Sequence, residues 1–178
     1  MESNFFSLGL KSPDEIIELG YEILPQTSAP DKRSKVLGIM GVAYFQKNDL
    51  NKSTEFFFEA KKEAEKSNNP ELIAKTYGTV AHQFIHLKLN DKAKEYLDKA
   101  NDEINEMPES NTKNLLKGLS HLDRGNLEFD LKNYQIANKE YLRSNRYFHS
   151  LLGKEKQVNY HFRRSLYNIG NSYYYLNQ

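Results

Sequence analysis

The sequence predicts an all-α protein built from repeated helix pairs. The stretch GNLEFDLKNYQIA at residues 125–137 recurs in weaker form at residues 41–53 and 81–93, and a half copy begins at Gly170. The small residues that open these copies are 40, 44 and 45 residues apart, which is the length of a helix pair. The apolar residues between them follow the spacing of one helix face. These observations predict an α-solenoid, in which each pair needs its neighbours to bury its apolar face.

The first predicted helix begins after Ser12. Ser12 can cap it, Pro13 suits the first turn and Glu15 completes a capping box. Apolar residues with helical spacing continue to Leu24, and the prolines between residues 25 and 30 end the helix. We interpret residues 1–30 as an N-terminal capping helix and linker, or as the second helix of a degenerate repeat, that lies against the first full unit.

The first full unit is predicted to contain two helices. Asp31 can cap a helix that runs to about residue 47, a turn follows at residues 48–49, and a second helix ends in the polar run 67–69. Three consecutive phenylalanines, at residues 56–58, cannot all point to one side of a helix, so we expect at least one to contact a neighbouring unit or a partner.

The remaining sequence predicts two more helix pairs and a single last helix. Pro70 opens a helix, Pro108 ends the next one, and Gly153 is a suitable C-terminal cap for the helix that begins at Tyr134. The predicted units are residues 34–68, 70–107, 111–152 and 154–178, the last of them incomplete. Because solenoids normally end in a polar capping helix, we expect a fragment of a longer protein.

Composition excludes several classes of function. The net charge of +1 gives no overall attraction to nucleic acid or anionic membranes. The absence of cysteine removes disulfides, thiolate metal sites and cysteine nucleophiles, and fits a reducing compartment, so we expect a cytoplasmic protein. Residues 1–10 lack the features of a secretory signal, and no apolar run is long enough to span a membrane.

Charge is unevenly distributed along the chain. Residues 95–130 carry nine acidic and four basic side chains, whereas residues 132–178 carry eight basic and two acidic ones. In the basic part, arginines alternate with tyrosines: Arg143, Arg146, Arg163 and Arg164 with Tyr141, Tyr147, Tyr160 and Tyr167. This composition suits phosphate contact and base stacking, but it also suits a packed helix face with solvated arginines, which we favour.

The sequence offers little support for catalysis. His82 and His86 share one helix face, the spacing of half a zinc site, but Gln83 replaces the glutamate base of zinc proteases and no third ligand is evident. The simpler interpretation is that both histidines line or pack in an inner groove. The sequence contains no phosphate-binding glycine loop and no arrangement for an activated nucleophile. We therefore expect no enzymatic activity, metal or cofactor.

The motif positions resemble those of the tetratricopeptide repeat (TPR) family. The first helices carry a small residue followed by a larger one three positions later: Gly41 and Tyr44, Ala81 and Phe84, Gly125 and Glu128, Gly170 and Tyr173. The second helices carry a small residue followed by a large one four positions later: Ser53 and Phe57, Ala93 and Leu97, Ala137 and Tyr141. This resemblance implies a right-handed α-α superhelix of about three and a half helix pairs. Units longer than the standard ~34 residues are similar to the sensor region of bacterial TPR-containing regulators.

The resemblance also implies a binding groove on the concave surface. In this family, residues one and four positions after the small residue of each first helix face inward. The groove residues implied in this way, with those one or two turns earlier on the last helix, are Asn126, Phe129, Arg164, Tyr167, Asn168, Asn171 and Tyr174, preceded by His82, Ile85 and Phe45. Asn126 and Asn171 correspond to asparagines that bind a peptide backbone in similar proteins, and an asparagine amide offers the matching donor and acceptor. Arg164 can pair with a carboxylate. The asparagines can equally bond within the groove or to water.

We therefore expect a module that binds a protein segment or peptide, as the input or scaffold part of a bacterial signalling or transcription regulator. The alternative is a stand-alone scaffold that forms homo-oligomers through its tyrosine-rich C-terminal helix. A nucleic-acid contact at the basic end is a third, less favoured function. No membrane contact is expected.

Overall fold

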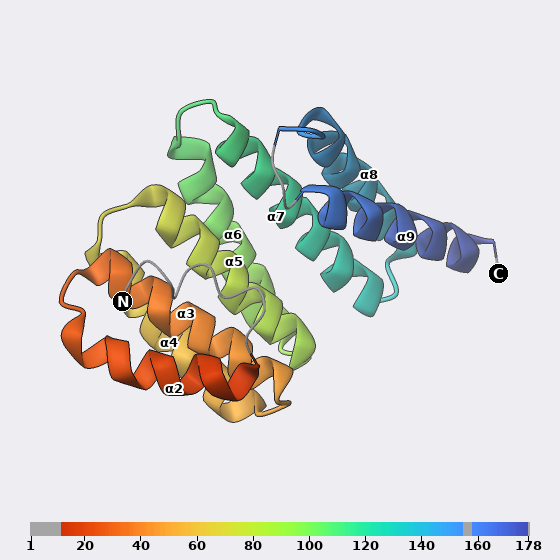
Figure 1. Cartoon of the computed structure of the whole chain (residues 1–178). Helices are drawn as coiled ribbons and strands as arrows, with labels where there is room; N and C mark the ends of the chain where they lie inside the picture. Colours follow the sequence, from red (N-terminus) through yellow and green to blue (C-terminus); the bar gives the residue numbers. More distant parts are fainter. Residues whose placement is uncertain (1–11, 155–157, 178) are drawn as a thin grey trace. The chain divides into compact units, whose positions relative to one another are not determined.

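In a computed structural model, which describes residues 12–154 and 158–177, all regular structure is helical. These residues form eight α-helices and one short 3-10 helix, and no strand occurs among them. The helices are α2 Pro13–Ile23, η1 Leu24–Gln26, α3 Pro30–Gln46, α4 Leu50–Lys66, α5 Pro70–His86, α6 Asn90–Glu106, α7 Asn111–Asp130, α8 Tyr134–Ser150 and α9 Val158–Leu176 (Figure 1). The predicted all-α class is confirmed.

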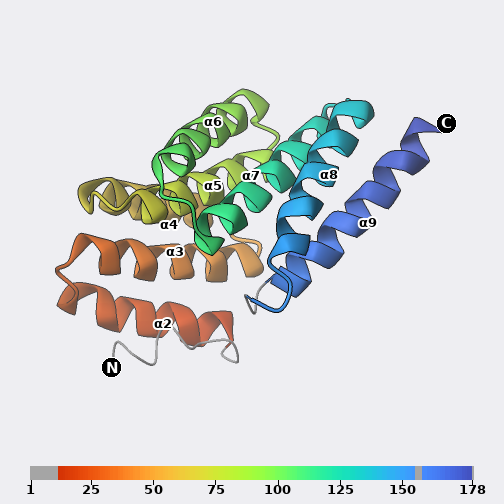
Figure 2. The same ribbon diagram turned by 90° about the horizontal axis from the view of Figure 1, so that it is seen from above.

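The chain forms two compact units, Met1–Thr76 and Tyr77–Gln178, whose boundary lies within α5. In the first unit, α3 packs against both α2 and α4. In the second unit, α6 packs on α7, α7 on α8 and α8 on α9. Figure 2 shows α7, α8 and α9 side by side. Successive helices therefore pack as neighbouring pairs, as a helical solenoid requires.

The first helix starts as predicted, but the second does not. The backbone N–H of Ser12 donates to Glu15 Oε2 at 2.8 Å and the N–H of Glu15 donates to Ser12 Oγ at 3.3 Å, so the capping box is confirmed. At α3 the N-cap is Ala29 and not Asp31. Pro30 occupies the first helical position because it has no N–H to satisfy there. Asp31 lies in the first turn, where its negative charge interacts favourably with the helix dipole.

The turns inside the three helix pairs share one backbone geometry. Asn48, Lys88 and Lys132 have φ values of 59°, 58° and 63°, in the left-handed region. In each turn the N–H of the next residue bonds to a carbonyl five residues earlier, at 3.0, 2.9 and 2.8 Å. This is the Schellman motif. The three turns are 40 and 44 residues apart, like the small motif residues, so the repeat in the sequence is also a repeat in the backbone.

The small residues of the motif let aromatic rings approach the first helix of each pair closely. A Cβ atom at Gly41 would lie 2.7 Å from the Phe57 ring, and one at Gly125 would lie 2.5 Å from the Tyr141 ring. Any side chain at these positions would collide with the ring of the paired helix. At Gly170, the equivalent position in α9, a Cβ would meet nothing within 4 Å.

Each unit has its own apolar core. In the first unit, Phe56 stacks on Tyr44 with ring centroids 5.2 Å apart, and Phe56 and Phe57 are both buried. In the second unit, one cluster of buried core residues comes from α7, α8, the turn after α8 and the start of α9: Leu122, Ala137, Tyr141, Phe148, Leu151 and Val158. Two of the three consecutive phenylalanines are thus buried within the unit, and Phe58 is half-buried.

The end of α8 differs slightly from the prediction. The helix ends at Ser150, two residues before the predicted end, and Gly153 supplies a positive φ of 78° in the turn that follows. α9 begins at Val158. No helix among the described residues is long and apolar enough to cross a membrane. The predicted lack of a secretory signal concerns residues 1–10, which lie outside the described residues.

Candidate functional site

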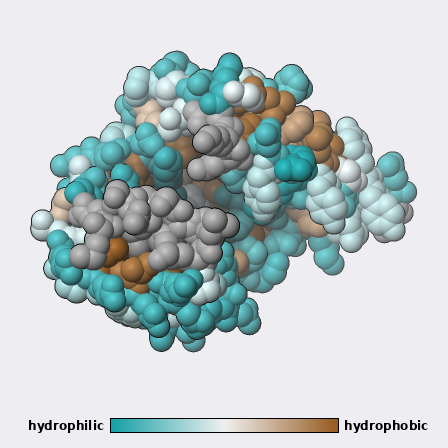
Figure 3. Space-filling view, in the orientation of Figure 1, coloured by the Kyte–Doolittle hydropathy of each residue, from teal (hydrophilic) through white to brown (hydrophobic). Residues whose placement is uncertain are grey.

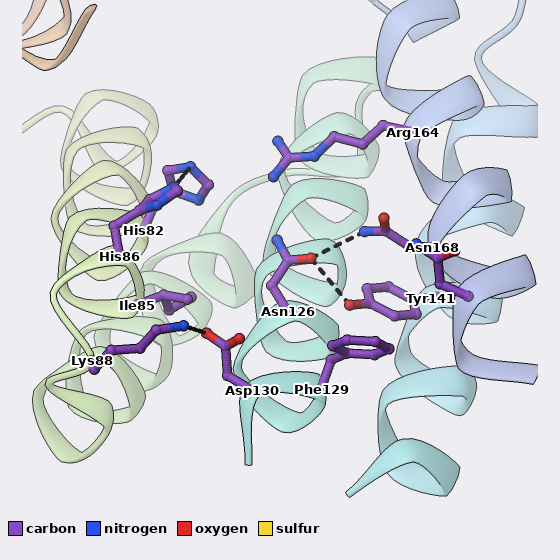
Figure 4. Close-up of a pocket in the computed structure, with 11 residues that line it drawn as sticks. His82, Ile85, His86, Lys88, Asn126, Phe129, Asp130, Tyr141, Arg164 and Asn168 are labelled. Atoms are coloured by element: carbon purple, nitrogen blue, oxygen red, sulfur yellow. Dashed lines mark hydrogen bonds and ion pairs between the residues drawn. The ribbon is translucent and has the colours of Figure 1, made fainter. Parts of the chain in front are cut away.

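The second unit contains a polar groove with a cavity of about 250 Å³ (Figure 4). Seven of the ten predicted groove residues line this cavity: His82, Ile85, Asn126, Phe129, Arg164, Asn168 and Asn171. They come from α5, α7 and α9, the first helices of successive pairs. His86, Lys88, Asp130 and Tyr141 also line it and were not among the predicted groove residues.

The other three predicted residues lie elsewhere. Tyr167 and Tyr174 are on α9 but outside the cavity, and they are 70% and 63% exposed. At about 100° per residue, they are rotated roughly 60 to 80° from Arg164, which faces the groove. Phe45 is half-buried in α3 of the first unit.

The rotation of α9 is set by two amide contacts from α8. Asn138 Nδ2 donates to Ser172 Oγ at 2.8 Å, and Asn145 Nδ2 donates to Ser165 Oγ at 3.0 Å. Ser165 and Ser172 are fully buried and share one face of α9. Because these small side chains face α8, the tyrosines roughly opposite them face outward.

Asn126 is held within the groove by its own neighbours. Its Oδ1 accepts hydrogen bonds from Tyr141 OH at 3.2 Å and from Asn168 Nδ2 at 3.0 Å (Figure 4). Its Nδ2 donates to Asp123 Oδ1 at 3.3 Å. For Asn126, bonding within the groove is therefore the alternative that the structure realises. Its amide fixes α7, α8 and α9 relative to one another at the groove floor.

Asn171 differs from Asn126. Its amide lines the cavity and makes no hydrogen bond to any residue in 12–154 or 158–177. Asn168 also keeps its Oδ1 without a hydrogen bond to these residues. The amide groups of α9 are thus the ones that can bond to a ligand.

Two histidines and an aspartate form a hydrogen-bonded chain at one end of the groove. His82 Nδ1 lies 3.0 Å from Asp123 Oδ1, and His86 Nε2 lies 3.1 Å from His82 Nε2. Burial lowers the pKa of His82, but the charge and hydrogen bond of Asp123 outweigh burial and raise that pKa above 6.5. The pKa of His86 is lowered by burial, by His82 and by Arg164. Within the described residues, no group of three or more His, Cys, Asp or Glu side chains could hold a metal ion.

Arg164 extends from α9 towards the histidine end of the groove, above Asn126 (Figure 4). It is half-buried and forms no ion pair or hydrogen bond with another side chain in the part of the chain that the structure describes. Its charge lowers the pKa values of both His82 and His86. Its neighbour Arg163 instead bonds to the carbonyl of Asn159 on its own helix at 3.3 Å.

The opposite end of the groove is apolar with one ion pair. Ile85 is buried, and the ring of Phe129 contacts Tyr134 and Tyr175 with centroids 5.2 and 5.4 Å away. Lys88 Nζ donates to Asp130 Oδ2 at 2.7 Å beside them. Along its length the groove thus changes from the histidines and Arg164, through amide groups, to an end where apolar side chains surround one ion pair (Figure 4).

Sequence patterns indicate some, but not all, of the four cavity residues that were not predicted. The four-residue spacing from His82 already places His86 on the same helix face. Tyr141 is the large residue of the second-helix motif, but nothing in the sequence indicates that its hydroxyl group lines a cavity. Lys88, in the turn after α5, and Asp130, at the end of α7, are 42 residues apart in sequence and meet only in the folded second unit. No local pattern indicates that pair.

The fold is an all-α array of successive helix pairs with a polar groove in its second unit. The sequence matches no known protein family and no curated protein. The structure is similar to a crystal structure of BtubC (BKLC) from P. vanneervenii, with a TM-score of 0.73 and 16% sequence identity. The similarity covers 90% of this chain and 65% of the BtubC chain. At this identity the likeness concerns the fold alone.

Proposed function

We propose that the groove of the second unit binds a peptide or a segment of another protein, as in the TPR-like proteins that the sequence resembles. The observation that carries this proposal is the pair of α9 amides, Asn168 and Asn171, which face a preformed cavity with hydrogen-bonding groups that no described residue uses. A peptide group has one donor and one acceptor, which an asparagine amide matches.

The size and polarity of the groove support a short segment over a small cofactor. A cavity of about 250 Å³ lies below the ~300 to 1,000 Å³ that encloses typical small-molecule ligands. An extended segment can place one or two side chains in such a cavity and continue beyond it. Phe129 and Ile85 offer apolar contact for one side chain, and the amides of α9 offer bonds to its backbone.

The test is selection from a random heptapeptide library displayed on phage, with the immobilised full chain as bait. Asn171→Trp fills the groove and Asn171→Ala removes the amide without disturbing any hydrogen bond among the described residues. We expect selected peptides to lose binding to the first variant and to bind the second about tenfold more weakly. Asn159→Ala, on an exposed part of α9, is the matched control. Peptides that bind all three variants like the wild type would refute the proposal.

Self-association is a second candidate, favoured by the outer face of α9. Tyr160, Tyr167 and Tyr174 are 62%, 70% and 63% exposed there, and Figure 3 shows pale, ring-bearing side chains along α9 at the right of the view. Exposed apolar clusters of this kind mark interaction surfaces. A mass in solution that rises with concentration, and that Tyr173→Asp with Tyr174→Asp returns to that of a monomer, supports it. A mass independent of concentration excludes it.

The wider role, as the input or scaffold part of a bacterial signalling or transcription regulator, is proposed on the resemblance alone. The intact mass of the protein in its own cells tests this role. A mass well above 20.8 kDa would direct the search to an output domain.

A further inference from the structure

We infer that the ligand of this groove carries a carboxylate that pairs with Arg164, and that a proton shared in the His82, His86 and Asp123 chain controls how tightly that carboxylate binds. This inference rests on the proposed function and names both the chemistry of the ligand and the regulation of its binding.

Among the described residues of the groove, Arg164 is a cation without an ion-pair partner. Lys88 is paired with Asp130 and His82 with Asp123, whereas Arg164 has no ion pair within residues 12–154 and 158–177. A half-buried guanidinium forms its strongest hydrogen bonds with a carboxylate, often with two parallel N–H groups. The cavity that Arg164 lines is open to a ligand, so a ligand carboxylate can supply these bonds.

The three-membered chain changes charge with one proton. With His82 protonated, its two N–H groups donate to Asp123 and to His86, and the chain has no net charge. When His82 loses that proton, Asp123 leaves the chain with a charge of −1. A negative chain attracts Arg164 and repels a ligand carboxylate beside it. The ligand therefore binds more tightly when the chain holds the proton.

The charged and titratable groups around His82 determine how readily its imidazole takes up the proton. His86 faces it from α5, Asp123 from α7 and Arg164 from α9, with Lys88 acting on His86 from the following turn. Asp123 raises the pKa of His82, and the lowered pKa of His86 means that the pair takes up one proton before a second. Since a bound carboxylate favours the protonated chain, ligand affinity should fall as the pH rises through the His82 pKa.

The experiment uses three tripeptides as probes on the full chain. Acetyl-Leu-Ala-Asp-amide carries a side-chain carboxylate, acetyl-Leu-Ala-Ala carries a terminal carboxylate, and acetyl-Leu-Ala-Asn-amide is the neutral control. Binding is followed by NMR through the Arg164 Nε–H and Asn171 side-chain signals at pH 6 and pH 8. At pH 6 we expect at least one carboxylate peptide to bind about tenfold more tightly than the neutral peptide. The same peptide should bind at least about threefold more weakly at pH 8 than at pH 6.

Two variants and one control assign the effect. Arg164→Gln should remove the preference for carboxylate. His82→Gln leaves Asp123 charged at both pH values, so it should remove the pH dependence and hold the preference near its wild-type level at pH 8. Arg163→Gln, the adjacent arginine outside the groove, should change neither. The side-chain and terminal carboxylate peptides, compared with each other, show which source of carboxylate the groove accepts.

The outcomes separate this inference from the proposed function. If all three peptides bind equally, or bind independently of pH, through Asn171, the groove binds peptides and the present inference is wrong. If none of the peptides shifts either signal and no phage peptide is selected, the proposed function and this inference both fail.

Discussion

The substitution Gly125→Ala tests the packing on which the groove is built. The new Cβ would lie 2.5 Å from both Cδ1 and Cε1 of the Tyr141 ring, which is 2% exposed and has its hydroxyl bonded to Asn126. Burial of the ring and the hydrogen bond of its hydroxyl group oppose a movement of Tyr141 away from the new Cβ. Overpacking of this kind costs about 1 to 3 kcal/mol, whereas alanine gains about 1 kcal/mol over glycine in a helix. We expect a net loss of up to about 2 kcal/mol in the free energy of unfolding.

Gly170→Ala is the matched control because Gly170 occupies the same motif position in α9. A Cβ there meets nothing within 4 Å, so only the helix propensity acts. We expect this variant to gain about 0.5 to 1 kcal/mol. Urea unfolding followed by far-UV circular dichroism measures both variants and gives opposite signs if the reasoning is correct.

A double-mutant cycle isolates the clash itself. In a Tyr141→Ala background the ring is absent, and Gly125→Ala should then stabilise the protein like Gly170→Ala. If Gly125→Ala is neutral or stabilising with Tyr141 in place, or if it remains destabilising without the ring, close packing at Gly125 does not explain the small residue in the motif.

Three further predictions concern a cap, a turn and a titration. Lys113→Met should destabilise the protein by about 1 to 3 kcal/mol, because Nζ of this buried lysine donates to the backbone carbonyls at the end of α6. The control Lys117→Met leaves those hydrogen bonds intact, so its loss of unfolding free energy in the same urea assay should be much smaller. Lys132→Gly should raise the free energy of unfolding by about 0.5 to 1 kcal/mol, since its φ of 63° suits glycine. Asp123→Asn should bring the NMR pKa of His82 from above 6.5 to below it, because burial then acts without the opposing carboxylate.

The titration also fixes the sign of a pH effect on stability. A raised His82 pKa contributes stability that is fully present below its unfolded value of about 6.5 and is lost as the pH rises through the folded pKa. Asp123→Asn should therefore destabilise the protein more at pH 6 than at pH 8. An equal loss of stability at both pH values would contradict the pairing of His82 with Asp123. A loss for Lys113→Met no larger than that for Lys117→Met would contradict the role of Lys113 at the end of α6. A destabilised Lys132→Gly would contradict the argument from its backbone angle.

The sequence predicted the helices well because their ends carry local signals. The capping box at Ser12, the proline that opens α5 and the proline after α6 all act within a few residues. Such signals do not need the tertiary structure. Asp31 was misjudged because proline at the first position competes with it, and that competition is also local.

The groove was only partly predictable because side-chain partners across helices leave no local pattern. The repeat spacing predicts seven residues that line one cavity, but nothing in the local sequence indicates that Asn126 also bonds to Tyr141 and Asn168. Tyr174 follows the motif rule in sequence and still faces outward, since Ser172 fixes the rotation of α9 against α8. Such choices depend on packing between helices far apart in sequence.

The Schellman turns have a consequence for where the chain accepts extra length. Each turn inside a helix pair occupies three residues, whereas the connections between pairs occupy three residues after α4, four after α6 and seven after α8. Differences in repeat length therefore arise at the connections between pairs and in the first helices, since α7 has 20 residues and α3 and α5 have 17. The turns that contain Lys88 and Lys132 keep their three-residue length, and Lys88 itself lines the groove. A reporter peptide inserted at residues 108–109 should leave peptide capture intact, whereas the same insertion at residues 131–132 should abolish it.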